Sequence, residues 1–154
     1  MRTGDVAGAM GKGLMAGVAG TALMTLSSTI EMKLTGRAAS SAPADAAAKV
    51  LGVEATGDAE KARFANVVHW AYGTTWGAVR GLVGVAGLTG PAAAGAHFAA
   101  VWGSGLVVLP ALGVAPPVRE WGAKALLTDA CHHLVYAAGA GLAYAALDRR
   151  SCQR

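Results

Sequence analysis

The sequence predicts an all-α integral membrane protein: a four-helix bundle with a short interfacial helix in its first loop. Apolar residues make up 54% of the chain and charged residues only 14%, against about 25% charged in an average soluble domain. Four stretches of roughly 20 mainly apolar residues occur, the helical length that crosses a hydrocarbon layer of about 30 Å. We therefore expect residues 1–154 to form a single transmembrane domain. The expected spans are residues 12–30, 66–88, 91–114 and 123–147.

Small residues support a bundle held together by close packing. The chain has 22 glycines, and small residues let helix backbones approach each other in lipid, where no hydrophobic force draws helices together. In the first span Gly13, Gly17 and Gly20 share one face. In the second, a Gly-x-x-x-Gly-x-x-x-Gly run from Gly73 to Gly81 predicts a packing seam, which serves either an internal contact or a homodimer.

Proline, glycine and acidic residues mark the connections. In the loop 31–65, Pro43 begins and Gly52 ends a predicted interfacial helix over 43–51. Asp58 favours a helix start, so the second long helix is expected to begin before the bilayer and to run about 30 residues. A tight turn is expected over 88–91, and Pro116 and Pro117 prevent the third span's helix from continuing through the connection 112–122.

The net charge of +4 does not indicate a nucleic-acid partner, because the basic residues lie in connections and tails without a long basic run. Membrane lipids are the expected partners. Four spans place both termini on one face, and the pair Arg149 and Arg150 at a span end favours the cytoplasm for that face. No phosphate-binding glycine loop or other catalytic signature is present, which favours a non-enzymatic role, and no cofactor is predicted.

Polar residues inside the spans are the candidate functional groups, because such residues are costly in a membrane and usually face the bundle interior. Helix rise predicts two layers of them. The layer near the long loop contains two acids and three histidines: Glu31, His69, Asp129, His132 and His133. The layer nearer the termini contains Arg80, His97 and Tyr136.

Several roles are open for these groups. Arg80 is expected to hydrogen-bond Tyr136 and helix carbonyls, or else to bind a lipid phosphate or an anionic solute. Glu31 is expected to form an ion pair with Lys33 or Arg63 at the headgroup level.

Asp129, His132 and His133 are expected to form an internal hydrogen-bonded network that holds the fourth span against the second. The alternatives are proton handling or transport and a metal or haem site. Two adjacent histidines point about 100° apart on a helix, so a metal site would need His69, Asp129 and His133 together.

The last third of the chain resembles the YagU-like inner-membrane family, a domain family of unknown function. The resemblance rests on the run from Leu109 to Val118, on Asp129, on the His133–Tyr136 segment and on Asp148-Arg149-Arg150. His132 departs from the family pattern, where a glycine is expected, and the long loop is unlike the family's. The resemblance implies a multi-pass protein of the bacterial cytoplasmic (inner) membrane, linked in some members with acid or envelope stress.

Three function classes follow. The leading one is a small membrane protein with a structural, partner-binding or lipid-binding role, acting with a membrane-protein partner or as a homo-oligomer. The second is a component of a transporter or channel for protons or a small solute. The third is a redox protein or enzyme that uses the histidines to hold a metal or haem.

Overall fold

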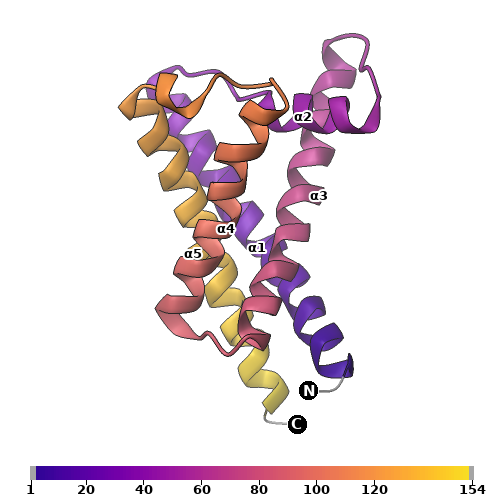
Figure 1. Ribbon diagram of the computed structural model, residues 1–154, viewed down its shortest axis with the longest axis vertical. Helices are drawn as coiled ribbons and strands as arrows, with labels where there is room; N and C mark the ends of the chain where they lie inside the picture. Colours follow the sequence, from indigo (N-terminus) through magenta and orange to yellow (C-terminus); the bar gives the residue numbers. More distant parts are fainter. Residues whose placement is uncertain (1–2, 153–154) are drawn as a thin grey trace.

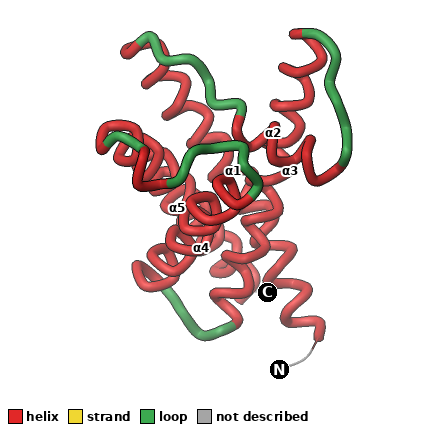
Figure 2. Tube along the Cα trace, turned by 45° about the horizontal axis from the view of Figure 1, so that its top comes forward, coloured by secondary structure: helices red, strands yellow, loops and turns green. Residues whose placement is uncertain are grey.

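The computed structural model describes residues 3–152, and this part of the chain is all-helical, as predicted. Four long helices alternate in direction, and the start of α1, the end of α5 and the α3–α4 turn lie at one end of the molecule (Figure 1). The remaining connections lie at the other end (Figure 2). The helices are α1 (Thr3–Thr35), α2 (Ala42–Leu51), α3 (Asp58–Val85), α4 (Gly90–Ala111) and α5 (Ala123–Cys152), with a 3₁₀ turn at Val118–Glu120.

Helices α1 and α3 cross in close contact along the glycine seam, which is therefore an internal contact. A Cβ added to Gly77 would lie 2.6 Å from the Cα of Gly17 and closer still to the carbonyl oxygen of Gly13. A Cβ added to Gly81 would lie 2.7 Å from the carbonyl carbon of Ala9. Because these neighbours are backbone atoms, only glycine allows the two helices to approach this closely.

The interior and exterior of the bundle are inverted relative to those of a soluble protein. The buried residues are mainly alanines and glycines, together with polar side chains such as Thr21, Arg80, His97 and His132. Large apolar side chains are instead exposed on all four long helices. Examples are Met15, Leu26, Val67, Leu82, Val107, Val108, Leu127, Leu134 and Leu142. This pattern is the one expected where the surrounding solvent is lipid.

The helix bounds differ from the expected spans mainly at the ends. Helix α1 extends beyond 12–30 at both ends, whereas α5 begins at the expected Ala123 and continues past 147 to Cys152. Helix α4 ends at Ala111 rather than at 114, because the chain turns at Gly113, which has a φ of 67°. Helix α3 begins at Asp58 and runs for 28 residues, as expected, but it ends at Val85 before a turn through Gly87, which has a φ of 89°.

The short helix α2 spans Ala42–Leu51, close to the expected 43–51. Proline stands in its first turn, and Gly52 ends it in the left-handed conformation with its N–H bonded to the carbonyl oxygen of Ala48. The Lys49 ammonium donates a hydrogen bond to the carbonyl oxygen of Leu112, so α2 is tied to the end of α4.

Within residues 3–152, two helices, α1 and α4, are each long and apolar enough to cross a membrane. Helices α3 and α5 are also long, but buried or partly buried polar side chains such as Arg80 and His132 make them less apolar.

Candidate functional site

Polar side chains from α1 and α5 meet near the loop end of the bundle, where the sequence placed the first polar layer. The Glu31 carboxylate accepts hydrogen bonds from Nη2 and Nε of Arg37 at 2.7 and 2.9 Å. These bonds hold the pKa of Glu31 below its ordinary value. The predicted ion pair of Glu31 with Lys33 or Arg63 is therefore wrong. Helix α1 ends at Thr35, and the chain folds back to bring Arg37 to Glu31.

His132 joins this group from α5. Its Nδ1 lies 2.8 Å from the hydroxyl of Ser27, and its Nε2 lies 3.7 Å from the carboxylate of Glu31. The Nε2 atom is buried and has no hydrogen-bond partner. Glu31 and His132, which lie far apart in the sequence, are thus neighbours as the layer prediction required.

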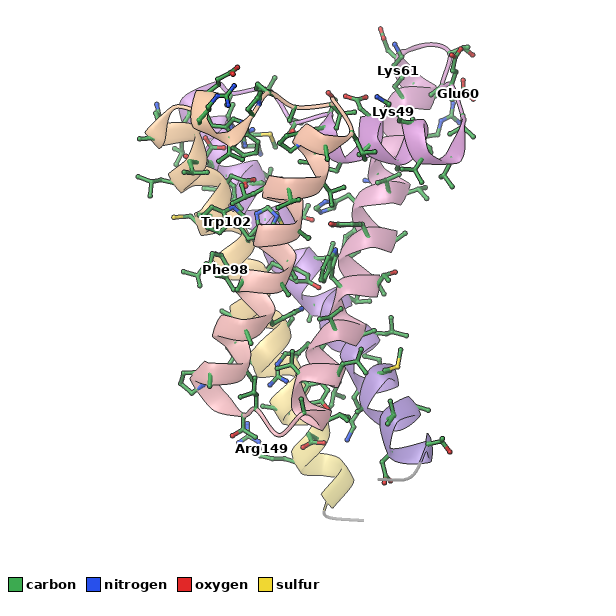
Figure 3. The ribbon with its side chains drawn as sticks, viewed as in Figure 1. Lys49, Glu60, Lys61, Phe98, Trp102 and Arg149 are labelled. Carbon is green, nitrogen blue, oxygen red and sulfur yellow. The ribbon has the colours of Figure 1, made fainter. Side chains whose placement is uncertain are left out.

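Of the other members of the first layer, Asp129 and His133 contact each other, whereas His69 has a separate partner. His69 lies with its Nε2 2.9 Å from the hydroxyl of Thr25, which ties α3 to α1. Asp129 accepts a hydrogen bond of 2.9 Å from the indole of Trp102 on α4 (labelled in Figure 3). His133 donates from Nδ1 to the backbone oxygen of Asp129, one turn earlier on its own helix.

These contacts bear on the metal hypothesis. In the described part of the chain, no three His, Cys, Asp or Glu residues are grouped so that they could hold a metal ion. His69, Asp129 and His133 do not form the required set, because His69 faces Thr25 whereas the other two lie together on α5. The predicted network between α5 and α3 is wrong for these groups. Asp129 bonds to Trp102 of α4, and His132 lies beside Ser27 of α1. His133 bonds within its own helix.

A second group occupies the middle of the bundle. The Tyr136 hydroxyl donates a 2.6 Å hydrogen bond to the carbonyl oxygen of Gly73, and His97 donates from Nε2 to the carbonyl oxygen of Trp76 at 3.0 Å. The rings of His97 and Tyr136 contact each other with centroids 5.5 Å apart. All of these bonds use carbonyl groups of α3, so both side chains fix α4 and α5 against that helix.

Arg80 does not bond to Tyr136, contrary to the expectation. Its guanidinium lies over the ring of Tyr144 on α5, with Cζ 4.5 Å from the ring centroid. The residue is only 4% exposed, and its Nε and Nη1 atoms are buried without hydrogen-bond partners. Beside it, Lys12 of α1 and Asp148 of α5 form an ion pair.

A cavity of about 510 Å³ adjoins Arg80 at the end of the bundle that carries the chain termini. Its walls come from α1, α3, α5 and the α3–α4 turn, and Arg80, Lys12, Tyr144 and Arg149 are among the lining residues. Figure 3 labels Arg149 at this end of the molecule. The three lining cations make the cavity the most distinctive chemical feature of the described structure.

Sequence reasoning missed several residues that complete these groups. Hydroxyl groups of Thr25 and Ser27 on α1 meet the two histidines, and the presence of polar residues inside an apolar span was the available signal. Tyr144 follows Tyr136 by two steps of four residues, which indicated a shared helix side. The role of Trp102 had no signal in the sequence, because its bond to Asp129 depends on how α4 lies against α5.

No protein-family model, curated protein or solved structure matches this chain. The resemblance to the YagU-like family therefore has no support from these comparisons, and the functional argument rests on the residues and their geometry.

Proposed function

We propose that the chain is an integral membrane protein whose four long helices cross the bilayer, and that it serves as a compact binding component for membrane lipids or a membrane partner. The observation that carries this proposal is the inverted burial pattern: small and polar residues are inside, and Leu, Val and Met side chains are outside. A soluble chain with this surface would expose a large apolar area on every long helix, which favours aggregation.

The two most apolar helices support the same conclusion. Within their most hydrophobic 18-residue windows, only 28% of α1 and 17% of α4 is buried inside the bundle. The core helix of a soluble protein would be mostly buried. These helices are instead mostly exposed, which is the expected state of a helix that faces hydrocarbon.

Polar residues in α3 and α5 do not argue against four spans, because they are directed into the bundle. His69, Arg80, His132 and Tyr136 each contact another long helix, and Arg80 and His132 are buried. Intramembrane polar groups that pair with one another or with backbone carbonyls are the tolerated kind. A lipid-facing position for any of them would have been incompatible with a span.

A binding role is favoured over catalysis or redox chemistry because the interior polar groups other than Arg80 bond to one another and to helix carbonyls. Ser27 with His132, Thr25 with His69 and Tyr136 with Gly73 each join two helices. Such bonds specify how helices pack. Placement in a bacterial inner membrane with cytoplasmic termini stays part of this proposal, and the Arg149–Arg150 pair supports the orientation.

Topology mapping with single cysteines tests the proposal. In a variant with Cys131→Ala and Cys152→Ala, we would introduce Ser40→Cys, Glu120→Cys or Thr89→Cys and label intact cells or sealed vesicles with a membrane-impermeant maleimide. We expect Ser40→Cys and Glu120→Cys to label from one side and Thr89→Cys from the other, because the α3–α4 turn lies opposite the other connections.

Alkaline carbonate extraction of the same membranes provides the second readout. The protein should stay in the membrane pellet and be released only by detergent. Release by carbonate, or equal labelling of all three cysteines from one side, would overturn the four-span proposal.

A further inference from the structure

The strongest unexplained feature of the molecule is the guanidinium of Arg80. Two of its nitrogen atoms, Nε and Nη1, are buried without hydrogen-bond partners. A buried charged donor left unpaired is costly, and arginine donors almost always find an acceptor. The side chain therefore lies in a position that an anionic acceptor would complete.

The contact with Tyr144 does not supply this acceptor. The aromatic face stabilises the positive charge from above, with Cζ 4.5 Å from the ring centroid. The N–H groups of a guanidinium lie in its own plane and point outward from its edge. The contact with the ring therefore leaves the guanidinium charge without an anionic partner, which favours a phosphate or carboxylate beside it.

The cavity beside Arg80 has the size and charge for such a ligand. Its volume of about 510 Å³ falls within the range of roughly 300–1,000 Å³ that is typical of small-molecule sites. Three cations line it (Lys12, Arg80 and Arg149) against two acids (Asp5 and Asp148), which leaves a net charge of +1 (3 − 2).

The depth of Arg80 suits the headgroup region. It lies five residues before the end of α3 at Val85, which corresponds to roughly 7.5 Å along the helix at 1.5 Å per residue. The lining residues Leu88, Thr89 and Arg149 are exposed, whereas Arg80 is buried. The cavity thus connects the exposed end of the bundle with a buried cation.

We propose that this cavity is a binding site for a phosphate group, in which the guanidinium of Arg80 makes the main charge-assisted contact and Arg149 lies at the exposed edge. The phosphate belongs either to an anionic phospholipid headgroup or to a free anion. This site gives the proposed lipid-binding role a defined ligand group. Only the lipid source of the phosphate depends on the proposed membrane placement.

Isothermal titration calorimetry of the full chain in detergent tests the site. The titrants are inorganic phosphate, short-chain phosphatidylglycerol and short-chain phosphatidylcholine, each added below its micelle concentration where one applies. We expect the anionic lipid to bind more tightly than phosphatidylcholine, because the cavity carries a net positive charge. Binding of inorganic phosphate as well would identify a free anion as a competent ligand, whereas binding of the lipid alone would identify the headgroup.

Variants then assign the binding to Arg80. Arg80→Gln should weaken binding of the best titrant about 10- to 100-fold, since a charge-assisted contact is lost. Arg80→Lys keeps the charge and should weaken binding of the same titrant roughly tenfold. This variant replaces Arg80→Gln in the test if Arg80→Gln does not fold. Arg149→Gln should have a smaller effect of roughly two- to fivefold because this arginine is exposed.

The matched control is Arg119→Gln, which removes one arginine at the opposite end of the molecule, where the side chain is 82% exposed. Its affinity should equal that of the wild type. The proposal is overturned if no titrant binds the wild type, or if the Arg80 variants bind as tightly as Arg119→Gln. Carbonate extraction separates the two proposals: a chain that stays in the membrane but binds no titrant refutes only the phosphate site.

Discussion

Replacing Gly77 with alanine should destabilise the bundle sharply, although it adds a single methyl group. The new Cβ would lie 2.6 Å from the Cα of Gly17 and 2.7 Å from its nitrogen. Carbon atoms in contact lie about 3.5–4.0 Å apart, so the deficit is on the order of 1 Å. Both neighbours are backbone atoms of α1, and no rotamer change can relieve the clash. The helices must therefore move apart.

The size of the effect follows from this separation. A gap of about 0.5–1 Å forfeits a quarter to a half of the dispersion energy of each contact along the seam, and overpacking typically costs about 1–3 kcal/mol. Alanine recovers up to about 1 kcal/mol through its better helix propensity. We expect the free energy of unfolding to fall by about 2 kcal/mol, measured by titrating SDS into detergent micelles and following tryptophan fluorescence.

Gly11→Ala is the matched control, because it makes the same change on α1 where nothing lies within 4 Å of the added Cβ. It should be neutral or stabilising by up to about 1 kcal/mol. His133→Ala should also cost less than Gly77→Ala, since its Nδ1 bonds only to the backbone of its own helix. Equal stability of Gly77→Ala and Gly11→Ala would refute the reasoning that the seam joins α1 to α3.

Two further predictions concern the polar groups. Tyr136→Phe should lower the free energy of unfolding by about 1 kcal/mol, because its hydroxyl donates a buried hydrogen bond to Gly73; an unchanged SDS midpoint would contradict this. Arg37→Gln should raise the pKa of Glu31 toward its ordinary value, since it removes both hydrogen bonds to that carboxylate. Because the folded-state pKa is lowered, the ion pair stabilises the protein at neutral pH, and this contribution is lost as the pH falls through that pKa. Carbon-13 NMR of the carboxylate measures the shift, Arg119→Gln should leave it unchanged, and an identical pKa in Arg37→Gln would count against the pairing.

The positions of the helices could be predicted closely because their signals are local. Pro43 and Gly52 bracket α2, and the observed helix Ala42–Leu51 begins one residue before the expected range and ends with it. The start of α3 at Asp58 follows from the same kind of signal. The end of α4 was placed three residues late, because an apolar run continues through the turn at Gly113 and hydropathy alone does not detect a change in φ.

The partners of the polar side chains were harder to predict. Depth arguments placed Glu31 near His132 and His97 near Tyr136, and the structure brings both pairs together. They did not distinguish which neighbour in a layer each group would contact. Arg80 was expected to contact Tyr136 of α5, but it contacts Tyr144, two turns further along α5.

The sequence by itself determines that the chain is helical, where most of its turns lie, and that small and polar residues gather on particular faces. These properties depend on composition, on periodicity and on glycine and proline at defined positions. Only the tertiary structure decides that the seam of α3 packs on α1, that Glu31 pairs with Arg37 and that two donors of Arg80 lack partners beside a cavity. The reason is physical: these contacts depend on how each helix is rotated and on the angle at which helices cross. Close backbone packing sets the rotation and the crossing angle, and no single stretch of sequence specifies that packing.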